Sequence, residues 1–252
     1  MSRTGFAFAC ALSFSILGCE APSANALDPG QVLGRDHVVG MPGPIPSGHE
    51  PAPGPVAGNP PVIGDSCHSD DPAHICLAVK YVVYRDSADE PVVSQQSAIA
   101  NIRTVSHLWA QCNLGFQIDQ WLAIRPSDYQ LQYQTANYTE LDDIRNSFDD
   151  DTTLLIATTG TWNRAGTLGN TSANAWTSMP GGGPYGAILE RPVGTFANII
   201  GHELGHYLNL LHVSDNTDLL NPIIYTNSTK LTADQCTTAR AAAGFFWSRM
   251  YR

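Results

Sequence analysis

The chain contains few charged residues and no cluster of basic ones. Charged side chains make up 14% of its 252 residues, and the formal net charge is −10. A protein that binds nucleic acid or an anionic membrane surface needs a patch of Lys and Arg, so this composition argues against both partners. The apolar fraction of 43% is ordinary for a globular protein. We therefore expect a folded domain that does not bind nucleic acid.

Other familiar signatures are also missing. The sequence has no sustained internal repeat, no Ser-His-Asp arrangement and no phosphate-binding loop. Its long apolar run, residues 6–17, is too short to cross a bilayer as a mature helix. These absences leave one strong chemical motif, which is a group of histidines in the last third of the chain.

Residues 1–26 are predicted to be an export signal, with a basic start followed by the apolar run. Two processing sites compete. Residues 16–19 (ILGC) match a bacterial lipobox, which would place a lipid on Cys19; residues 24–26 (ANA) match an ordinary signal-peptidase site. The lipobox is favoured because the apolar run ends there. The protein is expected to be exported, to the extracellular space or the cell envelope, and to meet a membrane only through a lipid anchor at Cys19.

The cysteines support export. Outside the signal the chain has Cys67, Cys76, Cys112 and Cys236, and four thiols in an exported chain suggest two disulfides among three possible pairings. We expect Cys67 to pair with Cys76 in a short loop, and Cys112 with Cys236. The long bridge would join a helix early in the domain to one near its end.

Composition divides the mature chain in two. Residues 27–66 are rich in Pro and Gly and poor in large apolar side chains, which predicts an extended, disordered linker. It would act as a tether or as a short propeptide. Residues 67–252 are long enough for one sizeable core and form the predicted catalytic domain, which we expect to be a monomer.

Hydrophobic periodicity predicts an α/β or α+β domain with a mixed sheet. The pattern gives strands at 76–84, 116–124 and 152–159, a short edge strand at 185–190, helices at 94–112, 139–148 and 195–211, and a last helix from a Thr232–Gln235 capping box to Ala243. The intervening stretch 162–184, rich in Gly, Asn, Ser and Thr, is predicted to be mostly loop.

His202, Glu203 and His206 form an H-E-x-x-H pattern within the predicted helix 195–211. Residues four apart lie on the same helix face, so both imidazoles can reach one metal ion. Glu203 lies beside the first histidine, where its carboxylate can contact a water molecule bound to the metal. This pattern predicts a zinc site with Glu203 as general base.

A third histidine follows at a fixed distance. Continued helix would carry His212 about 15 Å along the axis from His202. It can return to the same metal only if the helix stops near Asn209 and the chain turns through a left-handed residue. Glycine is best at such a position and asparagine is the next tolerated. Three neutral imidazoles would leave zinc an open position for water, which is the arrangement of a catalytic site.

The extended pattern, H-E-L-G-H-Y-L-N-L-L-H, resembles that of the metzincin clan of zinc peptidases, H-E-x-x-H-x-x-G-x-x-H. Asn209 takes the usual Gly position, and Leu220 stands where the methionine of the clan's downstream turn is expected. The resemblance covers residues 152–243. It implies a twisted mixed sheet, a long active-site helix, a C-terminal helix, one catalytic Zn²⁺, and a protein or peptide substrate aligned along an edge strand, here residues 183–190.

The resulting prediction is a zinc metalloendopeptidase with His202, His206 and His212 as ligands. Two alternatives stay open. The chain could be a catalytically inactive, zinc-binding surface lipoprotein that captures a protein partner, or a metal-dependent amidase acting on cell-wall peptides. The intact Glu203 disfavours the inactive form.

Two acidic groups raise the question of calcium. Residues 149–151 are three consecutive aspartates, and Asp215, Asn216 and Asp218 follow the histidines. A charge run before a strand is more often a solvated turn than a site, and the second group could equally shape its loop. A Ca²⁺ site is possible from these residues but has no further support in the sequence.

Overall fold

A seven-stranded mixed sheet runs through the protein. The computed structural model describes residues 31–39, 42–45 and 62–252. The strand order is β3-β2-β4-β6-β5-β1-β7, and the strands are β1 (Val32–Val39), β2 (Ile75–Tyr84), β3 (Leu114–Ile124), β4 (Leu154–Thr158), β5 (Ala175–Ser178), β6 (Ala187–Leu189) and β7 (Ile223–Tyr225). The sheet mixes parallel pairs with the antiparallel pairs β5–β6 and β1–β7, as the sequence predicts.

The parallel half of the sheet is the most buried part. β2 pairs with β3 on one side and β4 on the other, all in parallel, and every residue of β2 is buried. Strands covered on both faces read as continuous apolar runs, which explains why β2 and β4 were recognisable from sequence, whereas β3 showed a partial alternation of apolar and polar residues. This half of the sheet packs against α1, which in turn contacts α3, the helix that carries His202 and His206.

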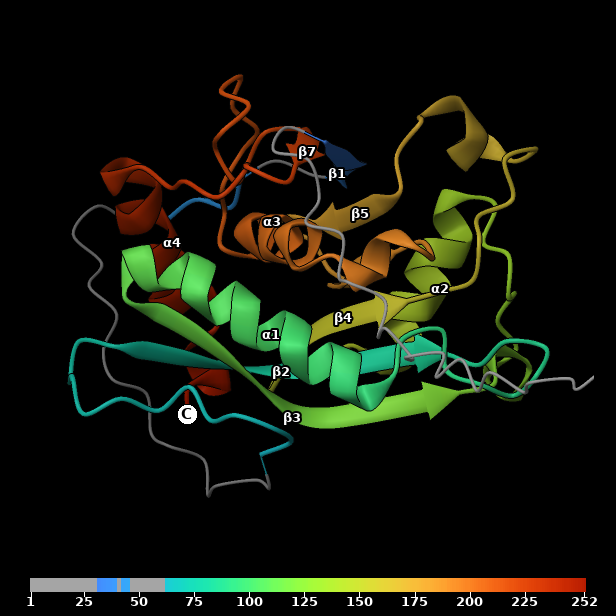
Figure 1. The fold of residues 1–252 in the computed structure, drawn as a ribbon, viewed down its shortest axis with the longest axis horizontal. Helices are drawn as coiled ribbons and strands as arrows, with labels where there is room; N and C mark the ends of the chain where they lie inside the picture. The colour runs from blue at the N-terminus through green and yellow to red at the C-terminus, as the bar shows by residue number, and fades with distance from the viewer. Residues whose placement is uncertain (1–30, 40–41, 46–61) are drawn as a thin grey trace, which may run out of the picture.

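The helices are α1 (Gln95–Trp109), α2 (Tyr138–Phe148), α3 (Ala197–Tyr207) and α4 (Ala233–Phe246). Figure 1 shows α1 in front of β2 and β3, with α3 lying beside it. The indole of Trp109 on α1 donates to the Gly201 carbonyl of α3 at 3.1 Å, which fixes one helix against the other. The predicted Thr232–Gln235 capping box is present at the start of α4, and that helix runs slightly further than predicted.

Three strands, β1, β5 and β7, were not predicted, and a fourth, β6, was predicted in the wrong place in the sheet. The stretch 162–184, predicted to be mostly loop, contains β5, and the predicted edge strand at 185–190 becomes β6, which lies between β4 and β5. The expectation that residues 183–190 form the edge is therefore wrong. At four and three residues, β5 and β6 are too short to show a reliable period. β5 packs against α3, the helix that carries His202 and His206.

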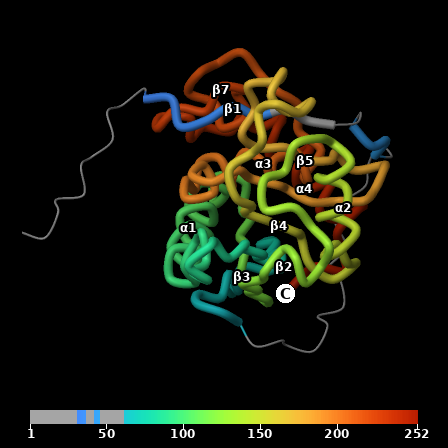
Figure 2. Tube along the Cα trace, turned by 90° about the vertical axis from the view of Figure 1, so that its right-hand side faces the viewer, coloured from blue at the N-terminus to red at the C-terminus, as the bar shows by residue number. Residues whose placement is uncertain are grey.

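The prediction of a disordered linker is wrong for residues 32–39. These form β1, which pairs in parallel with β5 and antiparallel with β7. In Figure 2, β1 lies beside β7, beyond α3 and far from α1. The backbone N–H and C=O groups of β1 pair with β5 and β7 rather than with water. These residues therefore form a strand although the surrounding stretch is rich in Pro and Gly.

Both predicted disulfides are present. Cys67 pairs with Cys76 and Cys112 with Cys236, with Cα atoms 5.4 Å and 4.7 Å apart. The second bridge joins the turn after α1 to α4. Two disulfides indicate an oxidising compartment. The predicted signal, its lipobox and Cys19 lie outside the described residues, and no helix within the described part is long and apolar enough to span a membrane.

The three consecutive aspartates each have a protein partner. Asp149 accepts the Tyr185 N–H, Asp150 pairs with Lys80, and Asp151 pairs with Arg249. Asp150 also accepts the backbone N–H groups of the two residues before β4. These contacts give the aspartates turn and ion-pair roles. The later acidic group behaves in the same way, with Asp215 and Asp218 accepting backbone N–H groups of their own loop.

The Lys80–Asp150 pair predicts an acid-sensitive contribution to stability. Burial acts to raise the Asp150 pKa, but the hydrogen bond from Lys80 and that from Thr152 outweigh it and lower the pKa to about 2. A depressed carboxyl pKa stabilises the fold above the unfolded value of about 3.9, and this contribution disappears as the pH falls towards 2. Asp150→Asn should therefore lower the free energy of unfolding at pH 7, by about 1–2 kcal/mol because the group is partly solvated.

Urea unfolding at pH 7 and at pH 2.5 measures this effect. The difference between the variant and the parent should fall to about a third at the lower pH, because a carboxyl group with a pKa of about 2 is still mostly ionised there. Asp151→Asn is the matched control, since its pair with Arg249 is exposed on both sides and should change stability by less than about 0.5 kcal/mol. A loss of equal size at both pH values would show that the charge of Asp150 does not contribute.

Candidate metal centre

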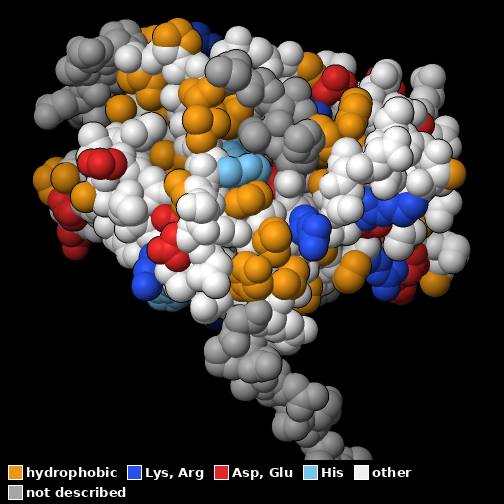
Figure 3. Space-filling model, turned by 90° about the horizontal axis from the view of Figure 1, so that it is seen from above, with side chains coloured by type: hydrophobic (Ala, Val, Ile, Leu, Met, Phe, Trp, Pro, Cys, Tyr) orange, Lys and Arg blue, Asp and Glu red, His pale blue; other side chains and the backbone are white. Residues whose placement is uncertain are grey.

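Two of the three histidines come from one face of α3. His202 and His206 are fully buried, and Glu203 between them is buried as well. The helix is apolar around this face and packs against α1 and β5, so the imidazoles are held without freedom to turn outward. His212 follows the helix, with its side chain 25% exposed, and Figure 3 shows a histidine surface set among hydrophobic side chains on this side of the molecule.

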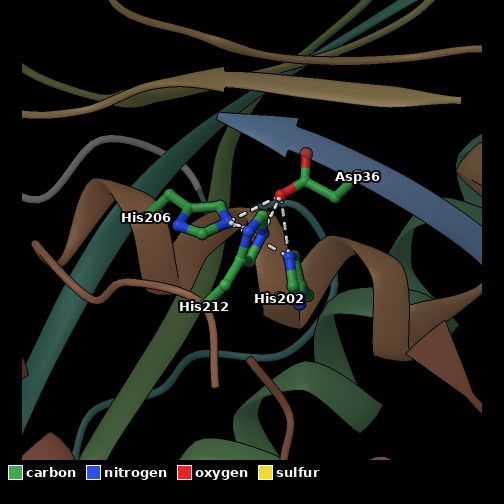
Figure 4. A group of neighbouring side chains, drawn as sticks. All are labelled: Asp36, His202, His206 and His212. Carbon is green, nitrogen blue, oxygen red and sulfur yellow. Dashed lines mark hydrogen bonds and ion pairs between the residues drawn. The ribbon is translucent and has the colours of Figure 1, made fainter. Parts of the chain in front are cut away.

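The chain turns back after α3 as the sequence predicts. Asn209 adopts a positive φ of 66°, the left-handed conformation that asparagine tolerates better than most residues. Its N–H bonds the His206 carbonyl and the Leu210 N–H bonds the Gly205 carbonyl, both at 3.0 Å, which closes the helix end. The turn redirects the chain so that His212 faces the two helical histidines (Figure 4).

Backbone carbonyls orient the two helical imidazoles. The Nδ1 atom of His202 lies 2.6 Å from the Leu219 carbonyl, and that of His206 lies 2.7 Å from the Leu210 carbonyl. A carbonyl only accepts, so each Nδ1 carries the proton and each Nε2 presents a lone pair. This is the arrangement that prepares a histidine for metal binding. Burial, the largest effect, also lowers the pKa of His202, which favours its neutral form.

The three Nε2 atoms converge on one point. The Nε2 of His206 lies 3.1 Å from that of His202 and 3.2 Å from that of His212. Ligand atoms of a tetrahedral zinc site, at about 2.0–2.1 Å from the metal, are separated by roughly 3.3 Å. Lone pairs aimed at each other at this distance repel unless a cation lies between them. The donor set therefore fits a metal ion such as Zn²⁺.

A fourth group completes the cluster. The Oδ2 atom of Asp36, on β1, lies 2.9 Å, 2.6 Å and 2.8 Å from the Nε2 atoms of His202, His206 and His212. Its side chain points from the strand into the histidines (Figure 4) and is fully buried. Together the four residues form a group capable of holding a metal, with all ligand atoms within 4.8 Å of one another.

The pKa values of the two carboxyl groups in the site are shifted in opposite directions. Burial acts to raise the Asp36 pKa, but the three imidazoles around its Oδ2 atom, His206 first, keep that pKa well below its usual value. Burial is also the main reason that the Glu203 pKa rises well above its usual value, followed by the negative charge of Asp36. The site thus favours the ionised form of Asp36 and raises the proton affinity of Glu203.

A residue of the sheet holds the side chain of Glu203 in place. The hydroxyl of Thr177 on β5 donates to its Oε2, whereas Oε1 is buried without a hydrogen-bond partner among the described residues. A buried carboxylate oxygen rarely lacks a partner. Here the free oxygen belongs to the residue predicted to handle the proton of a water molecule, so it is available for that water when one enters the site.

The segment after His212 forms a floor under the site. Leu220, the residue in place of the expected methionine, is fully buried. A Cβ added to Gly205 of α3 would lie 2.9 Å from Leu220 Cδ1, so the leucine packs directly against the helix between the two histidine turns. Its neighbour Leu219 supplies the carbonyl that orients His202. An apolar floor is therefore present without sulfur.

Asp36 is the site residue that the sequence analysis missed. It stands in a Pro/Gly-rich stretch, 166 residues before His202, and no local pattern marks a lone aspartate as a ligand. One signal was available in the sequence: the run 32–39 (VLGRDHVV) is more apolar and β-branched than the stretch that surrounds it, which is how a short strand reads.

Comparisons with known proteins leave the chain without a family. No protein-family model matches it, and no curated protein matches its sequence. Among solved structures it is similar to metalloproteinase-II from Bacteroides fragilis, with 15% identity, a TM-score of 0.43, and coverage of 66% of this chain and 53% of that one. A chaperone–substrate complex is matched at 10% identity and the same TM-score, over 71% of this chain and 36% of the other. The chain thus spans about half and about a third of these two chains.

Proposed function

We propose that this protein is a zinc-dependent endopeptidase of metzincin type, and that the described conformation is its latent form. The observation that carries the proposal is the convergence of three oriented Nε2 atoms and one carboxylate oxygen on a single point, with Glu203 beside it. His202, His206 and His212 would hold the zinc. When bound, the ion would polarise the carbonyl of a peptide and lower the pKa of a water molecule towards neutrality.

The residues of this chain supply the remaining chemistry. Glu203 accepts the proton of the attacking water and passes it to the departing amine. Thr177 holds the Glu203 carboxylate by one oxygen and leaves the other free. β5, rather than the predicted β6, is the strand along which an extended peptide would pair, because β1 already pairs with it in that way.

Latency follows from the position of Asp36. Its carboxylate occupies the corner of the site where water would have to enter, and β1 fills the slot between β5 and β7. A peptide substrate and β1 cannot pair with β5 at the same time. Residues 27–66 would then act as a propeptide rather than as a plain tether, and activation requires that β1 leave.

Zinc content and chelation test the metal site. The full chain should bind one zinc ion, and 1,10-phenanthroline should lower its melting temperature by about 10 °C. A site saturated about 1,000-fold above its Kd contributes about 4 kcal/mol, and each kcal/mol moves Tm by about 2–4 °C at this size. The reversed experiment, zinc returned to the stripped protein, should restore the lost stability. A chain that binds no zinc and is unaffected by the chelator contradicts the proposal.

Casein hydrolysis tests the activity, with Asp36→Ala used to open the site. Chelator-sensitive cleavage by this variant supports an endopeptidase. A zinc-loaded variant that cleaves neither casein nor gelatin would instead favour the zinc-binding surface protein. The intact Glu203, with its free and buried oxygen, is the feature that favours the enzyme.

A further inference from the structure

A second contact with the N-terminal segment is made by Asn209, in the turn between His206 and His212. Its Oδ1 accepts the Gly43 N–H at 2.8 Å, and its Nδ2 donates to the Gly43 carbonyl at 3.0 Å. The side chain is buried. Asn209 thus does two things at once: its backbone turns the chain after α3, and its carboxamide binds both polar groups of one residue in another segment.

The walls around Gly43 leave no room for a side chain. A Cβ built on Gly43 would lie 2.5 Å from the Cζ atom of Phe246 and 2.9 Å from the carbonyl oxygen of Pro180. The Phe246 ring is the end of a side chain and can shift, but the Pro180 carbonyl is backbone and follows directly after β5. The position is therefore selective for glycine by shape.

The two prolines that flank Gly43 are also compatible with binding of this segment by Asn209. Pro42 and Pro44 have no N–H, so Gly43 carries the one backbone donor of the Pro42–Pro44 tripeptide. Asn209 accepts that donor. Prolines also hold the backbone extended at little further entropic cost. A single carboxamide thus bonds the one backbone N–H of a Pro-Gly-Pro segment and the carbonyl of its glycine.

We infer that Asn209, Phe246 and the Pro180 carbonyl form a peptide-binding subsite that selects glycine, and that the chain's own Pro42–Pro44 occupies it in this structure. The ligand class is an extended peptide containing a Pro-Gly-Pro sequence. Gly43 lies seven residues beyond Asp36, at most about 25 Å along an extended chain, so the subsite would bind a residue several positions along the peptide from the reacting bond. Binding at a remote subsite is a recognised means of positioning a substrate.

The subsite can take another occupant. If the segment leaves, both polar atoms of the Asn209 carboxamide lose their partners in Gly43 and become available to another peptide. A glycine from another peptide restores both bonds. As a substrate subsite the inference rests on the proposed peptidase function, but as a binding site it can be tested without catalysis.

The first test measures hydrogen exchange of the Gly43 amide in the full-length, metal-free chain. Asn209→Gly removes the carboxamide and keeps the left-handed turn available, so it should fold. We expect the Gly43 amide to exchange at least tenfold faster in this variant than in the parent. Asn221→Ala, which removes a hydrogen bond elsewhere in the same loop, is the control and should leave Gly43 protected. Equal exchange in the parent and in Asn209→Gly overturns the inference.

The second test supplies the ligand in trans. Gly43→Ala should expel the segment and vacate the subsite, again in the full-length chain without metal. Calorimetric titration with acetyl-Pro-Gly-Pro-Ile-amide should then show saturable binding, at least tenfold tighter than with acetyl-Pro-Ala-Pro-Ile-amide. The double variant Gly43→Ala/Asn209→Gly should bind neither peptide. Equal binding of the two peptides, or binding of neither by the Gly43→Ala chain, overturns the inference.

These outcomes are independent of the peptidase proposal. A chain that binds no zinc and hydrolyses nothing can still protect Gly43 and discriminate the two peptides. Conversely, a zinc-dependent peptidase whose Gly43 amide exchanges freely would keep the proposed function and lose the glycine subsite.

Discussion

Glu203→Ala should retain zinc and lose peptide hydrolysis by about 10²–10⁴-fold, the range that a positioned general base contributes. Among the described residues, the hydrogen bond of Glu203 is made with Thr177 on β5 and not with any of the three Nε2 atoms. Removing it therefore leaves the donor set unchanged while no group remains to take the proton from the attacking water. The comparison is best made in an Asp36→Ala background, where β1 does not block the site.

Two measurements keep this result interpretable. Zinc content must match that of the parent, so that lost turnover is not lost metal. Thr177→Val serves as the matched neighbour: it removes the hydroxyl that holds Oε2 and should slow hydrolysis by a smaller factor, about tenfold, since one net hydrogen bond is worth about 1 kcal/mol. Undiminished turnover in a zinc-loaded Glu203→Ala chain would refute the role assigned to it.

The histidine helix was predictable because its chemistry is local. His202 and His206 lie four residues apart, and Asn209 marks the point where the helix must end; helical geometry then fixes where His212 has to return. The structure brings the three imidazoles together as this reasoning requires. The disulfides were predictable for a similar reason, since four cysteines permit only three pairings.

What the sequence did not reveal depends on contacts between distant segments. β1 and β7 pair with each other across almost two hundred residues of chain. β7 has only three residues, and β1 lies in a Pro/Gly-rich stretch whose composition indicates a linker. β5 lies within a stretch whose composition is typical of a loop. It is a short strand, and the neighbours that define it, β1 and β6, are visible only in the sheet. Asp36 becomes a site residue only through that pairing, so its role could not be read from its neighbours in sequence.

Asn209 has two roles, and only one of them, the left-handed turn after α3, could be predicted from the sequence. The left-handed turn accounts for the residue fully, and the sequence offers no reason to look further. Glycine would serve the turn at least as well, yet it could not bind Gly43. The choice of asparagine is therefore explained by the turn and the peptide contact together.

Asp36→Ala should convert the full-length chain from a latent to an open state. Asp36 is a fully buried carboxylate in contact with three imidazoles, and a hydrogen bond involving a charged group contributes about 1.5–3 kcal/mol. Loss of that energy raises the open fraction by roughly 10–100-fold, since 1.4 kcal/mol is a factor of ten. Casein hydrolysis by the untreated full-length chain should rise by the same factor.

The neutral isostere separates charge from shape. Asp36→Asn keeps the size of the side chain and its place on β1 but cannot offer an ionised oxygen, so its activity should fall between those of the parent and the alanine variant. Arg35→Ala, an exposed neighbour on the same strand, should stay as latent as the parent. If Asp36→Ala binds zinc and cleaves casein, but no faster than the parent does, the carboxylate does not hold the site closed; the pairing of β1 with β5 would then be what limits access of a peptide to the three histidines.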